Sequence, residues 1–133
     1  MQASLEQQLN SIDRQEREEA FKRLTALFAS GAIVLPDSGH AFNLHCHSFF
    51  SFNGYGYSPT GLAWCGRKLG LRAMALVDFD VLDGVDEFLE TAASMGLRSG
   101  AGMETRVFVP EFAEDEINSP GEPGVAYHVG IGF

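Results

Sequence analysis

The chain has 133 residues, of which 45% are hydrophobic and 20% are charged. This length suits one domain, and the composition excludes a fibrous or intrinsically disordered protein. A formal net charge of −9 argues against binding to nucleic acid or to an anionic membrane through charge alone.

The chain shows no apolar run of the roughly 18 residues that a membrane helix needs. Its first residues lack the basic segment and apolar core of a secretory signal. The only cysteines, Cys46 and Cys65, are too few for a disulfide framework and fit a reducing compartment. We therefore expect a cytoplasmic protein.

Residues 4–29 are predicted to form one helix, because apolar residues such as Leu24 and Leu27 recur at intervals of three or four positions. Ser30 and Gly31 supply a stop signal. We assign residues 1–36 to an N-terminal helical extension. A packing helix is the expected role, and an oligomerisation arm is the alternative.

After residue 36, short apolar runs alternate with segments of helical length, which is typical of a βα repeat. Ser58-Pro59-Thr60 is a helix start with proline at the first helical position, and Asp83-Gly84 opens a second helix. The predicted strands are Ala41 to His45, Leu71 to Val77, a run through Gly102 to Val109, and Val125 to Phe133. The sequence thus predicts an α/β domain over residues 37–133.

Polar side chains that can bind metal stand at the ends of these runs. They are His45 and His47, Asp78, Glu104 and His128. The spacing predicts that one βα unit separates each of these positions from the next. The carboxyl ends of parallel strands meet on one face of an α/β fold, so we expect these residues to share one cleft. Imidazole and carboxylate ligands suit zinc, iron or manganese.

The His-x-His pattern has a geometric basis of its own. Side chains alternate along a strand, so the rings of His45 and His47 point the same way while Cys46 faces the opposite side. Both rings can then reach one ion. A lone His-x-His pair is weak evidence, and the carboxylates at the other strand ends strengthen it.

Four stretches resemble, in order, the early motifs of the PHP (polymerase and histidinol phosphatase) superfamily. They are NLHCHSFFSFNGYGYSP, GLRAMALVDFDVLDGVDEF, GLRSGAGMETRV and YHVGIGF, and they span roughly residues 41–133. The resemblance implies a partial, distorted (β/α)7 barrel, similar to a TIM barrel, with about the first four strands preceded by an N-terminal helix. Many members of this superfamily hydrolyse phosphate esters; others act in histidine biosynthesis or as proofreading domains of bacterial replicative polymerases.

The resemblance also implies roles for single residues. His45 and His47 match ligands of the first metal, Glu104 matches a carboxylate that bridges two metals, and His128 matches a ligand of the second. Asp78 matches the aspartate of a Thr-Asp-His motif, where it would bind metal or orient the attacking water. Glu104 and Asp78 are therefore the expected catalytic carboxylates.

The chain departs from the superfamily pattern where a third metal would bind. Phe79 stands in place of the usual histidine, and Phe52 and Asn53 stand where aspartate or histidine is common. We therefore expect two divalent ions (Mn, Fe or Zn), although random loss of the site would leave a similar pattern. Superfamily domains also carry further strands, so we expect a truncated domain that a missing C-terminal segment completes, or a sheet that self-association or a partner chain completes.

Hydrolysis of a small phosphorylated substrate by a water activated between two metals is the leading hypothesis. The alternatives are a catalytically silent PHP module with a structural or interaction role, and an amidohydrolase-like metal hydrolase. Arg106, two residues beyond Glu104, is a candidate substrate-binding residue, with a surface ion pair as the alternative. Asp80 and Asp83 are expected to cap the following helix.

Overall fold

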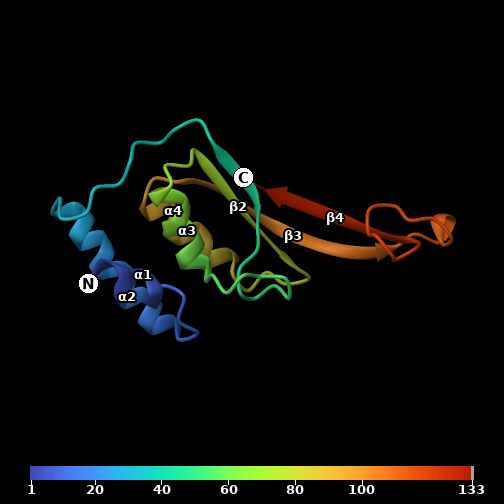
Figure 1. Cartoon of the computed structure of the whole chain (residues 1–133), viewed down its shortest axis with the longest axis horizontal. Helices are drawn as coiled ribbons and strands as arrows, with labels where there is room; N and C mark the ends of the chain where they lie inside the picture. The colour runs from blue at the N-terminus through green and yellow to red at the C-terminus, as the bar shows by residue number, and fades with distance from the viewer. Residues whose placement is uncertain (133) are drawn as a thin grey trace.

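One four-stranded sheet in the order β1-β2-β3-β4 organises the computed structural model, which describes residues 1–132 (Figure 1). The strands β1, β2 and β3 are parallel, and β4 runs antiparallel to β3. Their bounds are Phe42–Cys46 for β1, Ala73–Phe79 for β2, Arg98–Phe108 for β3 and Val125–Gly132 for β4. The predicted mixed α/β class is confirmed, and the end predicted at Phe133 lies outside the described residues.

The prediction of a βα unit between Glu104 and His128 is wrong. Only a short 3-10 turn at Pro110–Phe112 and a loop join β3 to β4, and the two strands form a hairpin. The loop carries Pro120 and Pro123 and lacks the apolar repeat of a crossover helix. A fourth parallel strand needs such a crossover, so the chain turns back instead.

Two helices, α3 (Pro59–Lys68) and α4 (Val85–Ser94), cover one face of the sheet (Figure 1). The start predicted for α3 is confirmed: Ser58 is its N-cap, accepts a hydrogen bond from the Gly61 amide and is followed by Pro59. The buried core between helices and sheet consists of Cys46, Leu62, Ala63, Met74, Leu76, Phe88, Ala92 and Leu97. The side chains on this face of β2 are therefore part of the buried core.

The single helix predicted over residues 4–29 is wrong, because the chain forms α1 (Gln2–Gln8) and α2 (Arg14–Ala29). Asp13 caps α2 by accepting a hydrogen bond from the Gln15 amide. The side-chain oxygen of Asn10, in the break, accepts from the Ser58 amide. Burial of Leu5, Leu9, Ala20, Leu24, Ile33, Leu35 and Trp64 in one cluster joins both helices to α3.

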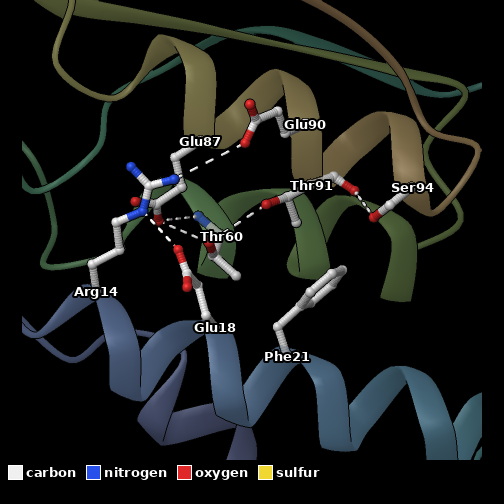
Figure 2. Close-up of a pocket in the computed structure, with 8 residues that line it drawn as sticks. All are labelled: Arg14, Glu18, Phe21, Thr60, Glu87, Glu90, Thr91 and Ser94. Atoms are coloured by element: carbon white, nitrogen blue, oxygen red, sulfur yellow. Dashed lines mark hydrogen bonds and ion pairs between the residues drawn. The ribbon is translucent and has the colours of Figure 1, made fainter.

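A buried ion pair ties α2 to α4. The Nη2 atom of Arg17 lies 2.5 Å from an Oε2 atom of Glu87, and both side chains are less than one-tenth exposed. Thr60 of α3 also donates to Glu87. Beside this pair, α2, α3 and α4 enclose a pocket of about 260 Å³, whose lining side chains Figure 2 shows.

Within residues 1–132, no helix combines the length and the apolar character needed to cross a membrane.

Candidate metal centre

Two histidines and one carboxylate meet at the end of β1. The Nε2 atom of His45 lies 2.9 Å from Oε2 of Glu104, and Nε2 of His47 lies 3.3 Å from the same oxygen. One possible ligand atom from each residue lies within 4.8 Å of those of the other two. Within the described residues, these form the sole group of three or more such side chains.

Local structure explains why these three side chains meet. His45 is on β1 and His47 lies just beyond it, and their rings contact edge to face at 5.0 Å. Glu104 belongs to β3, where it is in register with Phe79 of β2. Since alternate residues of a strand share a face, the carboxylate projects on the side of the sheet opposite the helix-packed Leu76.

The three residues fit a divalent cation. Ligand atoms bonded to one tetrahedral zinc ion at about 2.0–2.2 Å lie about 3.3–3.6 Å apart. The separation of 3.3 Å between His47 and Glu104 matches this spacing, and that of 2.9 Å between His45 and Glu104 is a few tenths of an ångström shorter. The Nδ1 atom of His47 is buried without a hydrogen-bond partner. This nitrogen is not the one that faces Glu104, so an ion bound at Nε2 would leave it unchanged, and the fit to a cation rests on the donor set and its spacing.

Exposure within this set of three, which we call the triad, is uneven. The side chain of Glu104 is 7% exposed and that of His47 is 14%, whereas His45 is 52% exposed. Solvent or a substrate would therefore reach the triad from the side of His45. Two histidines with one carboxylate form a ligand set known for catalytic zinc and for non-haem iron(II).

Asp78 does not join the triad. It precedes Phe79 on β2, so it faces the opposite side of the sheet from Glu104. Its carboxylate accepts hydrogen bonds of 2.5 Å from both the amide and the hydroxyl of Ser48. Burial raises the pKa of Asp78, and the Ser48 bonds oppose this rise. A metal-binding role for Asp78 therefore rests on the family resemblance alone.

Ser48 is a residue that sequence reasoning missed. It is fully buried and directly follows His47. Its two hydrogen bonds with Asp78 fix the backbone just beyond His47, so Asp78 and Ser48 help to position the His47 ring. A buried serine next to the His-x-His motif was the only local signal for this role.

His128 does not join the triad either. On the β3–β4 hairpin it pairs with Thr105, and Val129 pairs with Glu104. Paired residues share a face of the sheet, so exposed His128 points away from Glu104. Its assignment as a second-metal ligand also rests on the resemblance alone.

Aromatic rings occupy the surroundings of His47. Phe79 stacks on the His47 ring with centroids 5.5 Å apart and planes 18° apart. Phe52 lies 4.8 Å and Tyr127 lies 5.6 Å from the Phe79 ring. Two positions at which the chain departs from the superfamily, Phe52 and Phe79, are therefore in contact beside the triad. Tyr127 could not be placed there without the antiparallel register of β4.

Arg106 lies on the same face of β3 as Glu104, as predicted. Its guanidinium sits 5.6 Å from the centroid of the Phe52 ring. Its Nη1 atom is 3.4 Å from Glu122 in an exposed ion pair. The ion-pair alternative therefore describes this structure, and substrate binding by Arg106 stays a prediction.

The prediction that Asp80 and Asp83 cap α4 is wrong. The N-cap of this helix is Gly84, which has no side chain to form a capping hydrogen bond. Asp80 instead accepts a hydrogen bond of 2.5 Å from Thr105 and has a φ of 57°. It thereby links the end of β2 to β3.

No protein family model matches the chain. Over 111 residues it is 33% identical to the error-prone DNA polymerase of Mycolicibacterium paratuberculosis, a match that covers 77% of this chain and 10% of the polymerase. Over 68 residues it is 41% identical to the error-prone DNA polymerase of Cutibacterium acnes, covering 51% of this chain and 6% of that protein. The chain thus spans a tenth or less of these relatives.

A solved structure from Bifidobacterium adolescentis, provisionally assigned as a metal-dependent phosphoesterase, is 32% identical to the chain. The match covers 54% of this chain and 24% of that one, with a TM-score of 0.47.

Proposed function

Since the chain belongs to the PHP superfamily and its motifs match the N-terminal part of that domain, we propose that it hydrolyses phosphate esters with the help of a divalent metal ion. The observation that carries the proposal is the meeting of His45, His47 and Glu104 at one point. Mn, Fe or Zn suits this ligand set. The net charge of −9 argues against binding of nucleic acid through charge alone.

A bound divalent ion would lower the pKa of a water and polarise the phosphate oxygens. The residues of the chain then have separate tasks. His45 and His47 offer imidazole nitrogens, and Glu104 offers carboxylate oxygens from a buried position. Half-exposed His45 leaves an approach for the substrate. Arg106, on the face of Glu104, can bind a substrate phosphate through two hydrogen bonds if it leaves Glu122.

The two-ion centre implied by the resemblance stays a prediction. The triad supplies ligands for one ion, and Asp78 and His128 face away from it. Bridging by Glu104 would require a second set of ligands. The distorted (β/α)7 barrel stays a proposal on similar grounds, because the strands in the described part of the chain form an open sheet.

A catalytically silent module is the second candidate, and one observation favours it. Phe79, in the place of a family histidine, presents an apolar ring to His47 where a further ligand would stand. In that case the triad would bind an ion that supports the fold without turnover.

Hydrolysis of a generic phosphate ester with added Mn²⁺ separates the two candidates. The enzyme hypothesis predicts turnover that falls by more than about 100-fold in Glu104→Gln, since a metal ligand is lost. Exposed Glu111 offers a matched control, and Glu111→Gln should retain full activity. Absence of turnover in a metal-loaded chain would favour the silent module.

A further inference from the structure

We infer that Phe52, Phe79 and Tyr127, together with Arg106, form a subsite that binds a planar aromatic group of the phosphate ester. We call these four residues the aromatic shelf. The inference rests on the proposed function, because it names the substrate class of the same site. The substrates would be nucleotides or aryl phosphates, which share a flat ring system joined to a phosphate.

The shelf begins at the triad itself. Phe79 stacks on His47, and the Phe52 and Tyr127 rings contact Phe79 at 4.8 Å and 5.6 Å. The sheet register places these groups together: Phe79 is opposite Glu104, and Arg106 is opposite Tyr127. A ligand whose phosphate lies at the triad would therefore have its organic group beside the shelf.

Burial differs along the shelf in a way that suits a binding surface. The Phe79 side chain is 6% exposed and is held in place by packing, whereas the Phe52 side chain is 71% exposed. Tyr55, in the same loop, is even more exposed at 89%, but no aromatic or cationic partner is found for it within residues 1–132. Phe52 is instead held between Phe79 and Arg106, so its ring is presented in one place.

The charge of Arg106 indicates which ligands the aromatic shelf would bind. The guanidinium of Arg106 lies over the Phe52 ring, and its contact with Glu122 is long and exposed. A guanidinium can stack on a ring and still bind a phosphate oxygen. Aromatic rings stack favourably on planar ring systems such as nucleobases. Phosphate esters of sugars or short alcohols offer the anion without the ring.

A packing role alone would give a different result on truncation of Phe52. Loss of a largely exposed ring from a packing contact would change stability slightly and would leave ligand preference untouched. A subsite predicts the reverse, which is a small change in stability with a loss of discrimination between aromatic and non-aromatic phosphates.

Isothermal titration of the whole chain tests the inference with adenosine 5′-monophosphate, 1-naphthyl phosphate and inorganic phosphate, each with Mn²⁺ and with a chelator. We expect an aromatic probe to bind at least about tenfold tighter than inorganic phosphate, the size of one stacking contact. Phe52→Ala should abolish this preference, and the matched variant Tyr55→Ala should keep it. If Phe52→Ala does not fold, Phe52→Leu replaces it.

The outcomes separate the subsite from the proposed function. Preference for both aromatic probes supports stacking in general, and preference for one identifies a nucleotide or an aryl phosphate. A preference that persists in the chelator, without hydrolysis in Mn²⁺, would support the shelf and reject the enzyme. Equal binding of all three phosphates, or equal effects of Phe52→Ala and Tyr55→Ala, would overturn the inference.

Discussion

Phe79, which stands where the resemblance implies a metal-binding histidine, stacks on His47 with ring planes 18° apart. In place of a potential metal ligand, the chain has an apolar ring that packs against the His47 imidazole and orients it. An apolar ring offers no lone pair to a cation, so Phe79 itself does not serve as a ligand.

Restoring a histidine at this position should therefore add metal-binding capacity. In Phe79→His, a second imidazole stands beside His47, and we expect a higher molar ratio of bound Mn²⁺ or Zn²⁺ than in the wild type. Equilibrium dialysis with elemental analysis measures this ratio. Phe79→Leu is the control for loss of the stacked ring, and an equal ratio in both variants would contradict the prediction.

Replacing one partner of the Arg17–Glu87 ion pair should destabilise the fold much more than replacing both. Arg17→Met leaves the Glu87 carboxylate buried without its cation, and we expect it to lower the free energy of unfolding by about 3–5 kcal/mol. Adding Glu87→Met should restore much of the loss. Urea titration followed by circular dichroism measures both. Equal stability of Arg17→Met and wild type would show that the N-terminal helices do not depend on this contact.

Stability should also depend on pH through Glu87. Burial alone would raise the pKa of this carboxyl, but hydrogen bonds from Arg17 and Thr60 and the charge of Arg17 hold it below the ordinary value of 4.5. The unfolded chain then binds more protons in this range, so the stabilisation is present above pH 4.5 and is lost as pH falls through the lower, folded pKa.

Urea titrations at several pH values between 3 and 6, roughly spanning the carboxyl range, check this dependence. Glu87→Gln should flatten the curve relative to the wild type. Glu90→Gln, an exposed change on the same helix, should leave the slope unaltered. A wild-type free energy of unfolding that rises as the pH falls would contradict the predicted direction of the dependence.

Local patterns in the sequence predict much of the fold. The apolar runs around Met74 and the helix start at Ser58 are confirmed because each depends on neighbouring residues only. The N-terminal break was missed because Leu9 and Leu24 satisfy a helical repeat on both sides of it. A capping aspartate at residue 13 was the overlooked signal.

The site was harder to predict than the fold. The face of the sheet to which a side chain points depends on pairing between strands that are distant in the sequence. His45, His47 and Glu104 meet as expected, since His-x-His alternation is local. Asp78 and His128 were expected at the same point, but a shift of one residue on a strand moves a side chain to the other face. The hairpin register that exposes His128 has no signature in its own sequence.

Metal binding by the triad is tested most directly by elemental analysis of the purified chain after dialysis against Mn²⁺ or Zn²⁺. We predict at least about one tightly bound ion per chain, lost in His47→Ala and kept in His40→Ala, which changes an exposed histidine outside the triad. A wild-type chain without metal above background, or a His47→Ala variant that retains its ion, would contradict the assignment.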